Sequence, residues 1–214
     1  MKLLKLFVNQ FPLPNGAAVT ATPAIFKGAL FEVLERFNDI EFEYTEANVP
    51  QSGKGIYKMW QQAAIGADTF RVYSGANAAD DVYFTPTINL AYRAVHDLDH
   101  AAHYMEGRGT TSKPSELYLN CLMAKRVYSY ALRAGFTRKQ AMLAFFELYH
   151  DTCWQVHYYF EHNDFCADQK ALTTKLVSEC RGVKAVLSGQ LMTASIEMQR
   201  LLRECGVDFK LMGN

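Results

Sequence analysis

The pattern of apolar and polar residues along the 214-residue chain changes near residue 85. Up to that point, short apolar runs alternate with turn-forming residues, a pattern typical of strands mixed with short helices. The first helix is predicted to begin with Thr22 as its N-cap and Pro23 at its first helical position. The elements expected in this part are strands over residues 1–8, 40–44 and 70–73 and helices over 22–37 and 56–65.

Beyond residue 85 the apolar residues recur at intervals of three and four, which is typical of amphipathic helices. Thr85-Pro86 marks one helix start, and Thr137 followed by Gln140 is a capping box at another. Short connections favour antiparallel neighbours, so this part is predicted to be an antiparallel helical bundle. The expected helices run from residue 86 to about 105, over 114–134 and over 137–161, with one long or two shorter helices over 168–205.

Together these patterns predict an α+β chain that is predominantly helical. A small mixed α/β part over residues 1–84 precedes the helical bundle over 85–205 and a tail over 206–214. Half of the residues (50%) are hydrophobic, which is enough for one sizeable core, so we expect a single domain over residues 1–214.

The charge balance and the cysteines narrow the class of protein. The chain has 22 basic and 22 acidic residues, so nothing favours nucleic acid or a membrane surface as a partner. No apolar run is long enough for a membrane-spanning helix. The five cysteines are odd in number and never form a CxxC pair, which argues against a disulfide framework and against a thiolate zinc site. We therefore expect free thiols and a reducing, cytoplasmic location.

Three of the six histidines fall close together, at positions 96, 100 and 103, and share one face of the expected helix. Imidazoles four residues apart form the two-histidine half of many metal sites, as in the HExxH pattern. His96 and His100 are therefore predicted metal ligands, and Asp97 is the predicted catalytic base. The alternative is that the histidines are polar residues at the edge of a buried helix, since the apolar face of this helix borders them.

A second group of candidate ligands lies in the helix expected over residues 137–161. Glu147 and His150 form an E-x-x-H pair, the spacing by which a bundle helix directs a carboxylate and an imidazole inward, and Asp151 follows them. If this helix runs parallel to the histidine helix, a rise of about 1.5 Å per residue places the two groups at the same height.

The sequence thus predicts that Glu147 or Asp151 completes the metal site, with His150 beside them. Two alternatives stay open. The three side chains form a solvated helix face, or Glu116 faces the histidines and the site belongs to the first helical hairpin alone.

Two histidines and a carboxylate suit zinc or non-haem iron, and we expect a divalent metal with zinc favoured over iron. A zinc ion with an open coordination position predicts a metal-dependent hydrolase acting on a small molecule or a peptide. Iron held by two histidines and one carboxylate predicts an oxidoreductase instead. The third class is a partner-binding protein without enzymatic activity, in which the histidines form a structural or pH-sensitive cluster.

One segment carries a resemblance. Phe84-Thr85-Pro86, Asn89 and the run Arg93-Ala94-Val95-His96-Asp97, ending in His100, resemble a helix of uncharacterised proteins from phages and mobile elements. The resemblance covers less than a tenth of the chain and implies a shared helix with a metal site. His96 and His100 also resemble the HExxH metallopeptidases, but Asp97 replaces their glutamate. The HD phosphohydrolases share only His96-Asp97, and no earlier histidine completes their ligand set.

Overall fold

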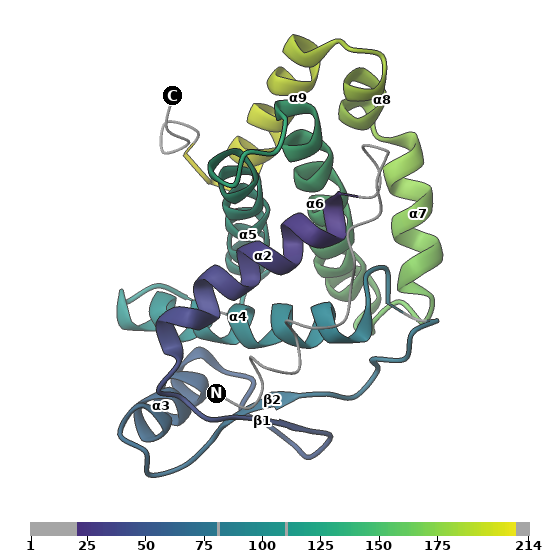
Figure 1. Ribbon diagram of the computed structural model, residues 1–214. Helices are drawn as coiled ribbons and strands as arrows, with labels where there is room; N and C mark the ends of the chain where they lie inside the picture. Colours follow the sequence, from purple (N-terminus) through teal and green to yellow (C-terminus); the bar gives the residue numbers. More distant parts are fainter. Residues whose placement is uncertain (1–20, 81, 110, 209–214) are drawn as a thin grey trace.

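The computed structural model describes residues 21–80, 82–109 and 111–208, and in this part of the chain it confirms the α+β, predominantly helical fold (Figure 1). The strand expected over residues 1–8 lies outside the described residues. The elements in chain order are α2 (Thr22–Leu34), the 3-10 helix η1 (Glu35–Phe37), β1 (Phe42–Thr45), α3 (Gly53–Ala64), β2 (Phe70–Tyr73), α4 (Pro86–Met105), α5 (Lys113–Arg133), α6 (Arg138–His162), α7 (Gln169–Glu179), α8 (Arg181–Leu187) and α9 (Leu191–Glu204).

Most predicted helix starts are confirmed. The Thr85 hydroxyl accepts a hydrogen bond from the Ile88 N–H, and the capping box of Thr137 and Gln140 is formed on both sides. The prediction that Thr22 caps the first helix is wrong. Ala21 already has helical backbone angles, so α2 begins one residue earlier and Thr22 is its first helical residue.

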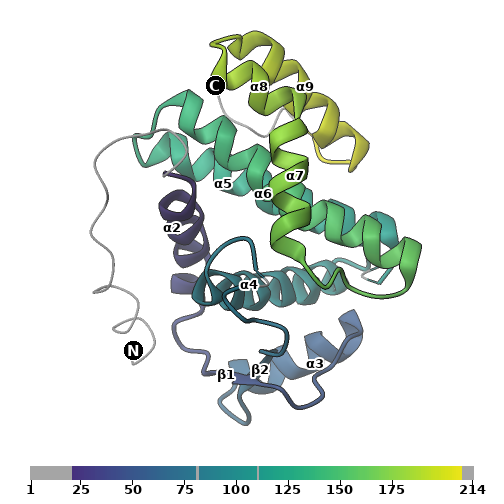
Figure 2. The same cartoon turned by 90° about the vertical axis from the view of Figure 1, so that its right-hand side faces the viewer.

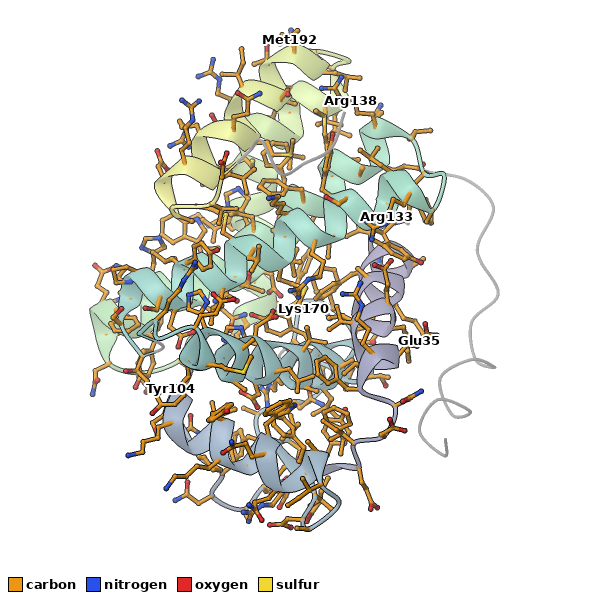
Figure 3. The ribbon with its side chains drawn as sticks, turned by 90° about the vertical axis from the view of Figure 1, so that its left-hand side faces the viewer. Glu35, Tyr104, Arg133, Arg138, Lys170 and Met192 are labelled. Atoms are coloured by element: carbon orange, nitrogen blue, oxygen red, sulfur yellow. The ribbon has the colours of Figure 1, made fainter. Side chains whose placement is uncertain are left out.

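The mixed part is a β1–α3–β2 unit with two parallel strands, which pair in a register that sets Phe42 opposite Phe70. α4 lies between this unit and the other helices, as both ribbon views show (Figures 1 and 2). At its C-terminal end, Tyr104 points toward α3 and packs against Tyr57, with ring centroids 5.6 Å apart (Figure 3). The long histidine helix therefore separates the two halves of the fold.

Two apolar cores lie on different faces of α4. One is shared with α2, α5 and α6 and includes Ile88 and Val95. The other is shared with α3 and the strands and includes Leu98 and Ala101. Because two faces of α4 are buried in this way, the face that carries the histidines is left for α5.

α5 and α6 form the antiparallel hairpin that the sequence predicts, and α4 crosses beneath them (Figures 1 and 2). The expectation that α4 runs parallel to α6, with α5 returning between them, is wrong, because α4 crosses the α5–α6 hairpin instead of lying along it (Figures 1 and 2). The first turn of α5 therefore meets the histidines, through Glu116.

The segment over 168–205 forms three helices instead of the expected one or two. Cys180 has an extended ψ of 123° and separates α7 from α8, and Gly189 has a positive φ of 79° and ends α8. The expected tail begins as folded chain, since Val207 is buried and the Lys125 Nζ donates to the Asp208 carbonyl at 3.0 Å.

All five cysteines are free thiols, as predicted. Among the described helices, none combines the length and the apolar character that crossing a bilayer requires.

Candidate metal centre

Two imidazoles and one carboxylate converge where α4 crosses the first turn of α5. His96 and His100 stand one turn apart on α4, and Glu116 reaches them from α5 with one oxygen toward each ring. The Nε2 atoms lie 3.1 Å (His96) and 3.3 Å (His100) from the carboxylate oxygens and 3.1 Å from each other. In the described part of the chain, this is the one set of three potential metal ligands whose atoms all lie within 4.8 Å of one another.

Protons alone do not satisfy these three contacts. Each Nε2 atom needs a hydrogen to bond its carboxylate oxygen, because an ionised carboxylate only accepts. If both nitrogens carry a hydrogen, the two N–H groups oppose each other across 3.1 Å. If one nitrogen lacks it, a lone pair faces a carboxylate oxygen. One contact therefore stays unsatisfied in either state.

A cation among the three groups removes this conflict, because every atom then directs a lone pair to it. Ligands about 2.05 Å from a tetrahedral zinc ion lie about 3.3 Å apart. Neighbouring ligands of an octahedral ion at about 2.1 Å lie about 3.0 Å apart. The separations of 3.1 and 3.3 Å fit both geometries, so they do not distinguish zinc from iron.

Glu116 is held in its charged form. Burial opposes ionisation, but the hydrogen bonds with His100 and His96 and the charges of these rings outweigh it and lower the pKa of Glu116 to about 2. Burial lowers the pKa of His96, whereas the hydrogen bond and charge of Glu116 and the nearby Asp97 and Asp99 raise it, with a net rise. The site thus offers one fixed negative charge to a cation.

The group lies at the edge of the protein interior. The His100 side chain is 7% exposed, whereas those of His96 and Glu116 are 18% and 22% exposed. A small molecule can therefore approach from the side of His96 and Glu116. The Nδ1 atom of His100 is buried and has no hydrogen-bond partner among the described residues, so packing holds this ring in place.

Polar side chains surround the ligands and tie α4 to α5. Tyr92 stacks on His96 with ring centroids 5.6 Å apart, and its hydroxyl donates to the Asn120 amide oxygen. The Asn120 Nδ2 in turn donates to the Glu116 carbonyl at 2.9 Å. Tyr92 and Asn120 thus lie one turn from a ligand on each helix, and they link the two ligand-bearing segments directly.

Two further contacts fasten the same crossing. Arg126 donates to both carboxylate oxygens of Asp99, at 2.9 and 3.0 Å. His103, the third histidine of the stretch, stacks on Tyr118 with ring centroids 5.0 Å apart, and it is not part of the ligand group.

Asp97 lies next to His96 but about 100° around the helix from it, outside the ligand group. Burial raises its pKa to about 7, the charge of Glu116 adds to this rise, and His96 and Arg93 oppose it. The Arg93 guanidinium also donates to the carbonyls of Tyr73 and Gly75 at the end of β2.

The structure does not bring the candidates of α6 into the ligand group. Glu147 is buried beside Thr22 and Tyr83, and burial raises its pKa to about 7. Asp151 accepts hydrogen bonds from Thr173 at 3.0 Å and from Gln155 at 3.3 Å. These two carboxylates are thus neither solvated nor joined to the histidines in that group.

His150 also stays apart from the ligand group. Both of its ring nitrogens are buried without a hydrogen-bond partner among the described residues, and burial lowers its pKa to about 4. The carboxylate that does meet the histidines, Glu116, was an open alternative from the sequence. The sequence signal for Glu116 is the short connection between α4 and α5, because it keeps the first turn of α5 close to the histidine helix.

Comparisons of the chain with protein families, with curated proteins and with solved structures gave no match. They add no support to the resemblance to phage and mobile-element proteins or to the HExxH metallopeptidases, and both stay predictions.

Proposed function

We propose that this protein is a metal-dependent hydrolase whose divalent cation, zinc before iron, is held by His96, His100 and Glu116. The observation that carries the proposal is the conflict at the crossing of α4 and α5. Three polar contacts meet there, and no protonation state of the two imidazoles satisfies all of them. A cation does so at ligand separations that match those of real sites.

The number of ligands favours catalysis over a structural role. Structural zinc sites are closed by four protein ligands, whereas catalytic sites use three and leave a position open. The described residues supply three. When bound, the cation supplies a hydroxide nucleophile near neutral pH and polarises the bond to be cleaved.

The residues of this chain have separate roles in the proposal. Glu116 would contribute the negative charge, and the imidazoles of His96 and His100 would complete the set of three protein ligands. The partial exposure of His96 and Glu116 gives a substrate access from that side. Asp97 stays the predicted proton acceptor, because it is the carboxylate next to His96 in sequence that is outside the ligand group.

The test is elemental analysis of the full chain purified without chelator, followed by hydrolysis assays with nitrophenyl esters and phosphates. About one zinc per chain, with hydrolysis that is lost on dialysis against a chelator and restored by zinc, supports the proposal. Stoichiometric iron favours the oxidoreductase. A protein that binds neither metal, even when zinc or iron is added back, overturns the metal-dependent function and favours the partner-binding protein.

A further inference from the structure

Three of the five thiols come together where α5, α6 and the end of α9 pack, and none of them belongs to the candidate metal centre. Cys121 lies on α5, Cys153 on α6, and Cys205 directly follows α9. All three belong to the same apolar core, and α9 packs against both α5 and α6. The thiols of Cys121 and Cys153 are fully buried, whereas Cys205 is 8% exposed. A small solute from solution therefore reaches Cys205 first.

Cys121 and Cys205 converge on one backbone oxygen. The Cys121 Sγ lies 3.9 Å from the Leu201 carbonyl oxygen, and the Cys205 N–H donates to the same oxygen at 3.2 Å. One turn further along α5, Lys125 binds the Asp208 carbonyl. α5 thus contacts the end of α9 and the following segment at two points, and both cysteines lie at the first of them.

The surroundings favour the thiolate form of Cys205. The thiols of Cys121 and Cys153 and the hydroxyl of Tyr149 form hydrogen bonds with the Cys205 sulfur, and they lower its pKa although burial opposes this. The same contacts and burial raise the pKa of Cys121 and of Cys153, so these two stay protonated. A charged sulfur beside two protonated ones is the arrangement of a nucleophilic thiol with neighbours that can resolve its oxidised form.

The three sulfurs are not arranged to chelate a metal together. Among the described residues, the three potential ligand atoms that lie close to one another belong to His96, His100 and Glu116, and no cysteine is part of such a group. Cys205 instead interacts with Cys121 and with Cys153 separately. This favours a reaction between pairs of thiols.

We propose that Cys205 is a site of oxidation by hydrogen peroxide, and that its product is a disulfide with Cys121. The Cys205 thiolate attacks one peroxide oxygen, the O–O bond breaks, and a sulfenic acid and hydroxide form. The Cys121 thiol then attacks the Cys205 sulfur, the S–O bond breaks, and water leaves with the Cys121 proton. Two thiols are oxidised by two electrons in total, and the peroxide is reduced to two water molecules.

Cys121 is the expected partner because the shared Leu201 carbonyl fixes its sulfur beside the Cys205 backbone. The bridge would join the end of α9 to α5, the helix that carries Glu116 in its first turn. The bridge uses no residue of the candidate metal centre, so the proposal of a disulfide does not depend on the proposed hydrolase.

The experiment treats the full chain with hydrogen peroxide, blocks the remaining thiols under denaturing conditions and maps the peptides without reduction. The five thiols of the untreated protein should fall to three, return to five with dithiothreitol, and yield a linked pair of peptides containing Cys121 and Cys205. Cys205→Ser should give no such pair. Cys166→Ser is the matched control, because Cys166 is partly exposed, lies outside the cluster and should not affect the bridge.

The wild-type peptide map decides the proposal even if a variant does not fold. Five thiols that persist while peroxide oxidises a reference peptide thiol would overturn it. So would oxidation of Cys166 with Cys205 still reduced. A linked pair of Cys153 and Cys205 would refute the assignment of Cys121 as the partner.

Discussion

Replacing Glu116 with glutamine tests the candidate metal centre most directly. The substitution keeps the shape of the side chain but removes the one negative charge of the ligand group. It also places an amide N–H₂ against one of the two imidazoles that the carboxylate oxygens now face at 3.1 and 3.3 Å. An amide nitrogen has no lone pair to offer a cation, so at most one ligand atom remains on this side chain.

The size of the effect follows from the ligand count. Substituting an outer-shell partner of a metal ligand costs about 10- to 100-fold in affinity, so loss of the charged ligand itself should cost at least about 100-fold. A metal at 100 times its wild-type Kd stabilises the folded protein by about 2.7 kcal/mol. At the same metal concentration, Glu116→Gln should gain only about 0.4 kcal/mol.

The assay is zinc titration by calorimetry, together with chemical unfolding with and without zinc. Glu147→Gln is the matched control, because Glu147 is the buried carboxylate that the sequence favoured as the third ligand. It should bind zinc as the wild type does. The assignment of Glu116 as the third ligand is refuted if Glu116→Gln keeps the wild-type affinity for zinc. Loss of that affinity in Glu147→Gln would assign the ligand to Glu147 instead.

Three further predictions have defined outcomes. Asp97→Asn should keep the bound metal but lower the turnover of any ester or phosphate that the protein hydrolyses by about 10²- to 10⁴-fold, and unchanged turnover would exclude its role as the base. Arg126→Met breaks the partly buried pair with Asp99 and should cost about 1.5–3 kcal/mol in urea unfolding, whereas Arg36→Met, at an exposed pair, should change stability by less than about 0.5 kcal/mol. The pKa of Glu147 is about 7 in the folded protein against an ordinary value of 4.5, so folding favours the protonated carboxyl. Its contribution to the free energy of unfolding is therefore fully present below pH 4.5 and is lost as the pH rises through 7. Relative to the wild type, Glu147→Gln should therefore gain at most about 3 kcal/mol between pH 4.5 and 8, and curves that stay parallel would contradict this.

Local signals in the sequence identified most elements of the fold. Thr85-Pro86 and the capping box at Thr137 act within one helical turn, so their outcome does not depend on distant packing. The break at Cys180 has no such signal, because neither glycine nor proline stands there, and packing decides the backbone angles. At the end of α8 the sequence does carry a signal, because Gly189 has a positive φ and glycine is common just after a helix.

The third ligand could not be chosen from the sequence, because it depends on how helices distant in sequence pack. Glu147 and Asp151 would reach the height of the histidines only if α4 and α6 ran parallel with α5 between them, but α4 crosses both helices of the hairpin (Figures 1 and 2). Each of these two carboxylates is instead used locally. Asp151 binds Thr173 and so fastens α7 to α6, and Glu147 is buried near the start of α2 beside Thr22. An E-x-x-H spacing indicates that both side chains face inward, but it does not predict which residues they contact.

The position of the histidines follows from the two cores that α4 separates. Residues at three-and-four spacing on one face enter the core shared with α2, α5 and α6, and those on a second face enter the core shared with α3 and the strands. Rotating α4 about its axis would expose one set or the other, which makes the direction of the third face a consequence of apolar packing. His96 and His100 occupy that third face, and the Arg126–Asp99 pair holds α5 against it. The imidazoles are thus directed at Glu116 before any cation arrives, and preorganisation of this kind lets a site with only three protein ligands hold a metal.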